Sequence, residues 1–385
     1  MKKPIALFVL LLSLCPSAFS APAIIPSPPQ VAAKGYILMD ADSGKIIVEH
    51  NADEKLPPAS LTKLMTSYVL SYELEQGDVT DDDMVTISKN AWAQNPEFVG
   101  SSLMWIEVGK KVRLEDLHKG IVISSGNDAS VAVAEYLAGS SRAFADVMNQ
   151  HAKLLGMTHT HFMNPHGLPD PNHYTTAHDL AILSRAILKY PKEYKLYSDR
   201  EFTYNNITQT NRNRLLWKDD SVDGLKTGHT KSAGYCLVAS AKRSGMRLIS
   251  VVMGTASESA RETETEKLLN YGFRYYETHQ LYNKGDKLTE SKVWEGAADS
   301  FPLGVERKIS VTIPRGQQDN LKAMMNLDEV VKAPVTKGKE YGELVLSLNG
   351  KEVLREPLIA LQSVEQGGWF KRMWDSLVLF FTQLI

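Results

Sequence analysis

The sequence of 385 residues has only two cysteines, Cys15 and Cys236. Cys15 lies in an N-terminal apolar stretch that we expect to be removed, so one thiol would remain. A single thiol excludes an intrachain disulfide and any metal site built on several thiolates.

The sequence also lacks an excess of basic residues. Lysine and arginine number 43 against 45 aspartates and glutamates, and loss of residues 1–20 with Lys2 and Lys3 moves the formal charge from −2 to −4. This balance gives no support for nucleic acid as a partner.

A helical H-E-x-x-H metal motif is missing as well. Six histidines lie close together in the chain, at positions 151, 159, 161, 166, 173 and 178. Zinc peptidases present histidines at tight helical spacing with a carboxylate, and no such spacing occurs here. We therefore expect no metal and no cofactor, and "NPHGLPDPNHYTT" is typical of a proline-rich loop.

Long apolar runs occur only near the two ends. "MKKPIALFVLLLSLCPSAFS", residues 1–20, is typical of a secretory signal peptide cleaved after Ser20. The segment 367–385 is interrupted by charges over about 18 residues, which makes it a poor membrane span but a good in-plane interfacial helix. The alternative is an amphipathic helix packed on the second domain or on another chain. Its apolar face would comprise Trp369, Phe370, Met373, Trp374, Leu377, Val378, Phe381, Leu384 and Ile385.

The length and the residue patterns indicate two domains. In residues 21–278 a β-hairpin pattern at 35–51 and two strands at 234–254 enclose mostly helical sequence, with a closing helix at 261–277. Helical patterns occur at 61–76, 113–123, 128–138 and 178–189. We predict an α/β (α+β) domain whose antiparallel sheet is assembled from distant segments and flanked by helices. Short strand patterns between turns at 279–366 predict a small all-β sandwich.

The stretch "PPASLTKLMTSYVLSYELEQG" places Ser60 at the start of an amphipathic helix and Lys63 one turn later. A serine at this position is usually a helix cap. It can also be a nucleophile, because the Lys63 amine can reach its hydroxyl and the helix N-terminus favours negative charge there. A lysine acts as a base only if burial or neighbouring cations lower its pKa. A second cation is therefore needed elsewhere in the chain.

Two later motifs supply that cation and polar partners. Ser125-Gly126-Asn127 lies between two helical stretches, and Lys226-Thr227-Gly228 lies in a strand-like segment. In this order the three motifs resemble the active-site set of penicillin-recognising serine enzymes. Together with "GLKTGHT", the trailing β domain and the C-terminal helix, they resemble the low-molecular-mass penicillin-binding proteins of D-alanyl-D-alanine carboxypeptidase type. The resemblance implies a β-lactamase/transpeptidase-like fold.

The resemblance also implies catalytic roles. Ser60 would attack the carbonyl between two terminal D-alanines, and Lys63 would be the general base. Ser125 would relay a proton to the leaving amine, Asn127 would hold the substrate amide and the Lys63 amine, and Lys226 would be the second cation.

Further residues are implied to bind substrate. Thr227 and Gly228 belong to the strand edge that pairs with the peptide, and the backbone N–H groups of Ser60 and His229 would form an oxyanion hole. Arg212 is a candidate for the substrate carboxylate, and Arg261 is a weaker one that we leave outside the predicted site. Asp128 is expected to cap the helix that follows it.

The implied partners are peptidoglycan stem peptides ending in D-Ala-D-Ala, β-lactams, and a membrane surface contacted by the C-terminal helix. The implied location is the periplasmic face of the inner membrane. Class A β-lactamases add an Ω-loop glutamate in an E-x-x-L-N context, for which we expect no match here. An endopeptidase of the same fold and a non-catalytic cell-wall scaffold remain the alternatives.

Overall fold

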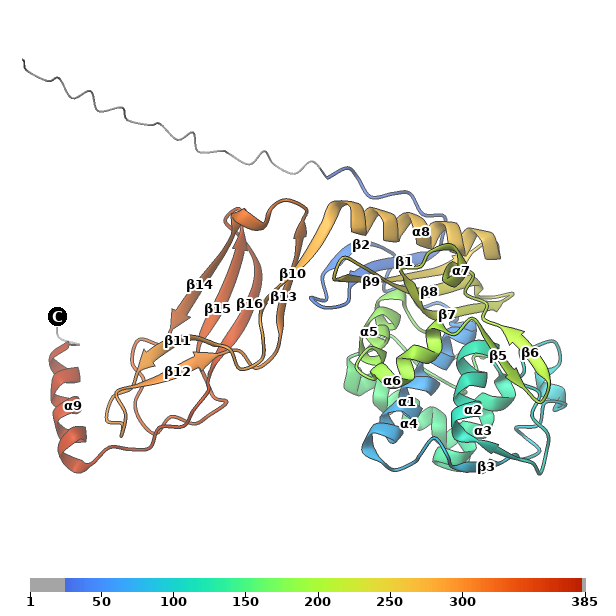
Figure 1. The fold of residues 1–385 in the computed structure, drawn as a ribbon, viewed down its shortest axis with the longest axis horizontal. Coiled ribbons are helices and arrows are strands. Elements are labelled where there is room, and N and C mark those ends of the chain that lie inside the picture. The colour runs from blue at the N-terminus through green and yellow to red at the C-terminus, as the bar shows by residue number, and fades with distance from the viewer. Residues whose placement is uncertain (1–24, 383–385) are drawn as a thin grey trace, which may run out of the picture.

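The computed structural model describes residues 25–382, so the expected signal peptide, residues 1–20, lies outside the described residues. Figure 1 shows an α/β domain beside a smaller β domain, with the last helix at the far end of the β domain.

The α/β domain is built on one five-stranded antiparallel sheet. The strand order is β2-β1-β9-β8-β7. The strands are β1 (Gly35–Asp40), β2 (Ile46–His50), β7 (Val222–Thr230), β8 (Gly234–Arg243) and β9 (Met246–Thr255). The N-terminal hairpin pairs with β9 more than 190 residues later in the chain, with Tyr36 opposite Val252. The prediction of a sheet assembled from distant segments is confirmed.

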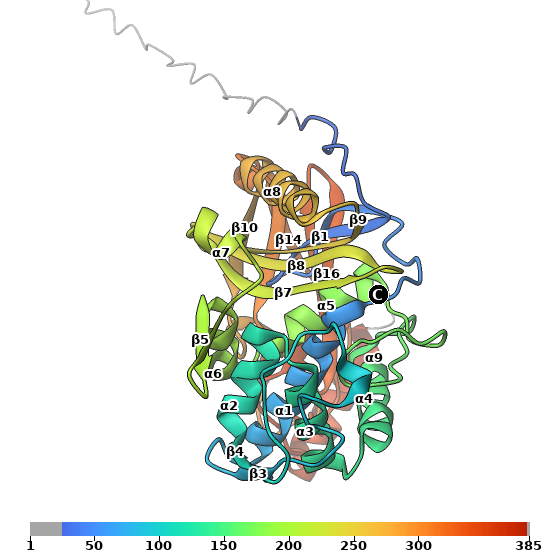
Figure 2. The same cartoon turned by 90° about the vertical axis from the view of Figure 1, so that its right-hand side faces the viewer.

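Helices cover both faces of this sheet. Helix α8 (Glu258–Tyr275) packs on one face, and α5 (Ala177–Ile187) packs on the other together with α1 (Lys63–Gln76). Figure 2 shows α8 on one side of the strands and most other helices of the domain on the opposite side. The latter include α2 (Leu114–Lys119), α3 (Asn127–Ala138), α4 (Ser141–Leu155) and α6 (Pro191–Tyr194), with the short strands β3 (Met84–Thr86), β4 (Lys111–Arg113), β5 (Glu201–Tyr204) and β6 (Ile207–Thr210). Helix α7 (Leu215–Lys218) packs on the α8 side, where Leu215 and Leu216 join the cluster that contains Leu268.

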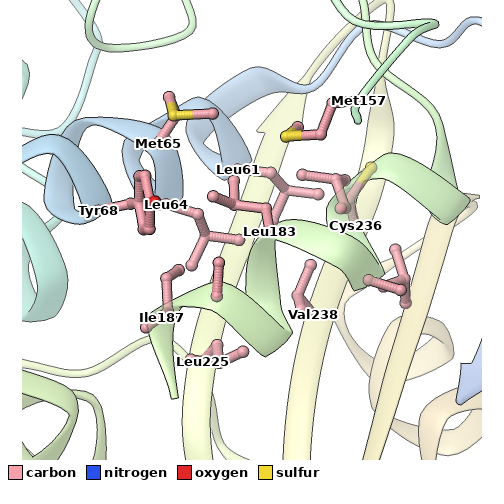
Figure 3. Packing of buried hydrophobic residues seen from close by; sticks show 14 of the residues in the cluster. Leu61, Leu64, Met65, Tyr68, Met157, Leu183, Ile187, Leu225, Cys236 and Val238 are labelled. Atoms are coloured by element: carbon pink, nitrogen blue, oxygen red, sulfur yellow. The ribbon is translucent and has the colours of Figure 1, made fainter. Parts of the chain in front are cut away.

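Helix α1 lies at the centre of the domain. Figure 3 shows Leu61 and Leu64 packed against Leu183 of α5 and the sheet residues Leu225 and Val238. All residues of α1 from 63 to 71 are buried, polar ones included. The helix therefore lacks the solvent-facing side that its amphipathic pattern predicted over this length. Buried hydroxyls of the helix find partners in other segments of the chain, as Thr66 donates to the Pro165 carbonyl at 2.6 Å.

The helix predicted at 113–123 changes its geometry partway. Helix α2 passes directly into one π-helical turn, Gly120–Ser124, which ends at Ser125. Ser125 itself has φ 59°, in the left-handed region. Single π turns are frequent at functional sites, and here the turn places the second predicted serine.

The β domain consists of two sheets around one core. Strands β10 (Tyr276–Tyr282) and β13 (Ile309–Pro314) form one sheet. The other has the order β11-β12-β16-β15-β14 and contains β11 (Lys287–Lys292), β12 (Ser300–Gly304), β14 (Leu321–Leu327), β15 (Glu340–Leu348) and β16 (Lys351–Ala360). Ile309 and Val311 share a buried cluster with Phe301 and Leu344 of the larger sheet. The prediction of a small sandwich is confirmed.

Helix α9 (Trp369–Thr382) buries Asp375 and Leu379 and contacts the β domain through polar side chains. Asp375 accepts the backbone N–H of Glu295 at 2.8 Å, and Lys371 pairs with Asp299 at 2.5 Å. Trp369 and Trp374 remain 67% and 65% exposed. No helix between residues 25 and 382 is both long and apolar enough to span a bilayer. Residues 384 and 385 of the expected apolar face lie outside the described residues.

Candidate active site

Ser60 lies in a 3-10 turn, Ala59–Thr62, immediately before α1. Its hydroxyl makes no helix-capping hydrogen bond, so the structure does not support the cap interpretation. Two glycines allow other segments to approach this turn closely. A Cβ on Gly167 would fall 1.8 Å from the Ala59 carbonyl oxygen, and one on Gly228 would fall 2.9 Å from that of Pro58. Both positions therefore require glycine to hold the turn against its neighbours.

The Lys63 side chain is only 1% exposed, and its Nζ has three hydrogen-bond partners. Its Nζ lies 3.2 Å from Ser60 Oγ, 2.7 Å from Asn127 Oδ1 and 2.7 Å from the His166 carbonyl oxygen. These contacts aim the amine at the Ser60 hydroxyl. The carbonyl of His166 belongs to the proline-rich loop, so this loop borders the site.

The electrostatic surroundings of Lys63 favour its neutral form. Burial and the nearby Arg212 cation lower the pKa of Lys63 to about 7, against a smaller opposing effect of Asp128. A neutral amine next to a hydroxyl can accept that proton, whereas an ammonium cannot. The geometry and the pKa together make Lys63 competent as a base for Ser60.

A second serine–lysine pair faces the first. Lys226 Nζ donates to Ser125 Oγ at 2.9 Å and to its neighbour's carbonyl, that of Thr227, at 3.3 Å. Burial, together with the cations Lys63, Arg212 and Arg261, lowers the pKa of Lys226 well below its usual value. The arrangement links Ser125 to a lysine that gives up its proton more readily than an exposed lysine does.

A cavity of about 350 Å³ opens above these residues. Its lining includes Ser60, Ser125, Asn127, Arg212, Thr227, Gly228 and His229, all of them predicted from sequence. Lys63 and Lys226 lie beneath the cavity, where they contact Ser60 and Ser125. The structure therefore brings every predicted site residue to one place.

Arg261, which was left outside the predicted site, also lines the cavity. It is only 3% exposed, and its Nε has no hydrogen-bond partner among the described residues. Its Nη2 lies 3.8 Å from Glu258, which also lines the cavity, so the Nε donor is the part of this buried guanidinium left to meet an anion such as a carboxylate. Arg261 lies in the first turn of α8, and nothing in the neighbouring sequence indicated that its side chain would line the cavity.

The expectation that Asp128 caps its helix is confirmed only in part. The Asp128 carboxylate accepts one N–H of the first turn of α3, that of Ala129 at 2.9 Å, although Gly126 before the helix provides no side-chain cap. It also accepts three N–H groups of the segment Met104–Ile106, at 2.8, 2.8 and 3.2 Å. This segment follows Ser101 and Ser102 in the cavity wall. Asp128 therefore holds one wall of the site in place.

The histidines do not form a metal site in the described part of the chain, where no group of three potential ligands occurs. His173 instead bonds to Thr62 Oγ1 at 2.8 Å, and burial lowers the pKa values of His166 and His173 to about 3 and about 4. Both are therefore neutral structural groups.

The letters E-x-x-L-N do occur, contrary to expectation, at 266–270. They lie within α8, and Glu266 does not line the cavity. The site itself therefore has no glutamate in that context.

The fold and the site define a serine hydrolase whose candidate nucleophile lies beside a lysine, where more familiar serine hydrolases have a histidine. Comparison with known proteins specifies the family. A family model described as "D-alanyl-D-alanine carboxypeptidase" matches residues 23–257, and one described as "Penicillin-binding protein 5, C-terminal domain" matches residues 276–366.

Individual relatives agree with these family matches. D-alanyl-D-alanine carboxypeptidase DacC of Escherichia coli is 47% identical over 372 residues, covering 96% of this chain and 93% of the relative. The crystal structure of penicillin binding protein 5 from Haemophilus influenzae has a TM-score of 0.85 at 44% identity, covering 89% of this chain and 100% of its own. Penicillin-Binding Protein D2 from Listeria monocytogenes, in its ampicillin-bound form, has a TM-score of 0.57 at 29% identity and covers 64% of this chain and 100% of its own.

The chain belongs to the D-alanyl-D-alanine carboxypeptidase family of serine peptidases, among the low-molecular-mass penicillin-binding proteins.

Proposed function

We propose that this chain removes the terminal D-alanine from peptidoglycan stem pentapeptides through an acyl-enzyme on Ser60. The observation that carries the proposal is the convergence of Lys63 on Ser60 and of Lys226 on Ser125 beneath one cavity with a cationic wall. A D-Ala-D-Ala peptide ends in a carboxylate, and the cations Arg212 and Arg261 complement it.

Acylation begins with neutral Lys63 taking the Ser60 proton as Oγ attacks the penultimate D-alanine carbonyl. The backbone N–H groups of Ser60 and His229 stabilise the oxyanion, and such donors contribute about 3–4 kcal/mol each to the transition state. The proton then passes through Lys226 and Ser125 to the departing amine. The C–N bond breaks and free D-alanine leaves, while Ser60 keeps the peptide as an ester.

Water completes the cycle by hydrolysing the ester, which returns the proton to Ser60. The β-lactam ring places a strained amide and a carboxylate where the substrate has a peptide bond and its terminal carboxylate. Penicillin should therefore acylate Ser60. Since no Ω-loop glutamate activates water in the cavity, we expect this acyl-enzyme to persist, unlike that of a β-lactamase. Rapid penicillin turnover without an accumulating adduct would contradict this.

The experiment that tests the function offers two substrates to the mature protein. We expect free D-alanine to appear from a stem pentapeptide while a cross-linked dimer remains intact, because Arg212 and Arg261 favour a terminal carboxylate. Loss of the dimer as the main activity would instead support an endopeptidase. No hydrolysis of either substrate would support the scaffold alternative.

Replacing Lys226 with alanine is expected to lower D-alanine release on the order of 10² to 10⁴-fold, as for loss of a group that transfers protons. The change removes the partner of Ser125 and a cation beneath the carboxylate site. The measurement is kcat/KM on the pentapeptide, with Lys231→Ala, an exposed lysine just after β7, as the matched control. Unchanged turnover in Lys226→Ala would remove the proposed role.

The pH dependence follows from the pKa of Lys63, which is about 7. The base must be neutral, so kcat/KM should fall by about tenfold per pH unit below this value. Arg212 lowers the pKa of Lys63, so Arg212→Gln should move the acidic limb to higher pH. Arg214→Gln, at a neighbouring exposed arginine that does not line the cavity, should leave it in place. An identical acidic limb in both variants would contradict this account.

We further propose that the protein is exported and lies at the periplasmic face of the inner membrane, attached through α9. The support is the exposed apolar face of α9, whose polar side is already bound to the β domain. Deletion of residues 367–385 is expected to release the protein into the soluble periplasmic fraction while activity on small peptides is retained. Fractionation of cells measures this, and continued presence in the membrane fraction would contradict it.

A further inference from the structure

A second cavity, of about 890 Å³, lies between the α/β domain and the β domain. One wall comes from the end of α5 and the turn between β8 and β9, and the other from β10 and β13. None of the residues at the Ser60 cavity lines it. It is therefore a separate feature of the molecule.

Direct hydrogen bonds between the domains hold the two walls of this interdomain cleft together. Ser43 Oγ lies 2.6 Å from Thr312 Oγ1, and Thr278 Oγ1 donates to the buried Asp40 carboxylate at 2.7 Å. Lys308 of the β domain pairs with Asp42 of the α/β domain at 2.5 Å. The cleft is thus built by specific contacts.

The lining of the cleft is strongly cationic, although the whole chain carries a formal charge of −2. Five cations line it against one carboxylate, that of Asp42, and they are Arg185, Lys189, Lys242, Arg247 and Lys308. Arg247 and Lys308 are neutralised by Asp223 and Asp42. The other three pair with no carboxylate within residues 25–382.

Arg185 is the most firmly positioned of these three cations. It is partly buried, and its Nε donates to the Ala41 carbonyl at 2.9 Å, which fixes the guanidinium in the wall. Lys189 and Lys242 are exposed at the cleft and can move to meet a ligand. A fixed guanidinium flanked by two mobile ammonium groups is complementary to a group bearing carboxylates.

We propose that this cleft is a non-catalytic binding site for a second, carboxylate-bearing stem peptide of the peptidoglycan polymer on which Ser60 acts. The inference rests on the proposed function, because a polymer whose stems each end in a carboxylate is a polyanion. Strand β8 runs from Gly234, opposite Thr230 at the active-site end, to Lys242 at the cleft, a span of roughly 25 Å. One polymer can therefore engage both sites, which raises the local concentration of stems at Ser60.

The test measures co-sedimentation of the mature protein with purified insoluble peptidoglycan. In Lys189→Glu/Lys242→Glu we expect the apparent Kd to rise by about five- to twentyfold, and wild-type binding to weaken with added salt. The matched control is Lys89→Glu/Lys153→Glu, which makes the same charge change at exposed lysines that line neither cavity. Equal binding by the two variants would overturn the proposal.

Two further measurements make the outcome unambiguous. Hydrolysis of a soluble pentapeptide should be the same in both variants and the wild type, which shows that the variants are folded. If the wild type fails to hydrolyse the pentapeptide, the proposed function is wrong, but the binding to peptidoglycan can still be measured and decides the proposal about the cleft. Vesicles containing anionic lipid should bind both variants equally. Loss of vesicle binding in the cleft variant, with polymer binding intact, would overturn the proposal in favour of lipid.

Discussion

Replacing Ser60 with alanine is expected to lower D-alanine release by on the order of 10⁴-fold or more, as found when the nucleophile of a serine hydrolase is removed. The change deletes the only hydroxyl that the Lys63 amine contacts within the site, at 3.2 Å. Intact-mass measurement after penicillin treatment should show an adduct on the wild type and none on Ser60→Ala. Peptide mapping of the wild-type adduct should locate it on Ser60.

The same variant separates the nucleophile role from that of a helix cap. Loss of a capping hydroxyl would destabilise the protein by about 0.5–2 kcal/mol. Because Ser60 makes no capping hydrogen bond, we expect Ser60→Ala to unfold in urea at nearly the wild-type midpoint. Ser198→Ala, at an exposed serine far along the chain, should retain full activity. Penicillin labelling that persists in Ser60→Ala would assign the chemistry to another residue.

Replacing Lys63 with methionine is expected to slow both D-alanine release and penicillin acylation by about 10²- to 10⁴-fold, the usual contribution of a general base. Methionine approximates the length of the side chain but cannot accept a proton. It also leaves Asn127 Oδ1 and the His166 carbonyl without their donor, so a stability loss of about 1–3 kcal/mol should accompany the loss of rate. The measurements are the second-order acylation rate and urea unfolding.

Two comparisons isolate the base from the packing. Lys63→Arg keeps a cation, but a guanidinium does not lose its proton in proteins, so it should be as slow as Lys63→Met. Lys153→Met, at an exposed position of α4, should be as active as the wild type. Acylation of either Lys63 variant at the wild-type rate would show that the proton of Ser60 goes elsewhere.

Much of the fold was predictable because it follows from local patterns. The alternation of residues in the hairpin at 35–51 and in β8 and β9 corresponds to strands, and Gly77 ends α1 in the left-handed conformation, where the apolar pattern stopped. The full burial of the first half of α1 was not predictable in this way. Polar residues such as Ser67 suggest that the helix has a solvent-facing side. In the fold, however, the Ser67 hydroxyl bonds to the buried His118, 51 residues further along the chain, at 2.7 Å.

The candidate site also has parts that the sequence predicts and parts that it does not. Its three motifs were recognisable, since each is a short run whose spacing is local. The carbonyl of His166 was not, because a backbone group carries no mark in the sequence. Asp128 was assigned only to its helix, whereas its carboxylate accepts N–H groups both from α3 and from a distant segment, and the sequence does not mark the latter. Arg261 was underestimated for a related reason, because burial decides whether an arginine is solvated or left with an unpaired donor.

The sequence by itself determined the pairing of Ser60 with Lys63, because one helical turn brings positions three apart together whatever surrounds them. Only the tertiary structure decided that Lys63 can act as a base. Its pKa of about 7 depends on burial and on Arg212, which lies 149 residues away in the chain. Electrostatic free energies depend on distances in space and on exclusion of water, and folding alone sets both.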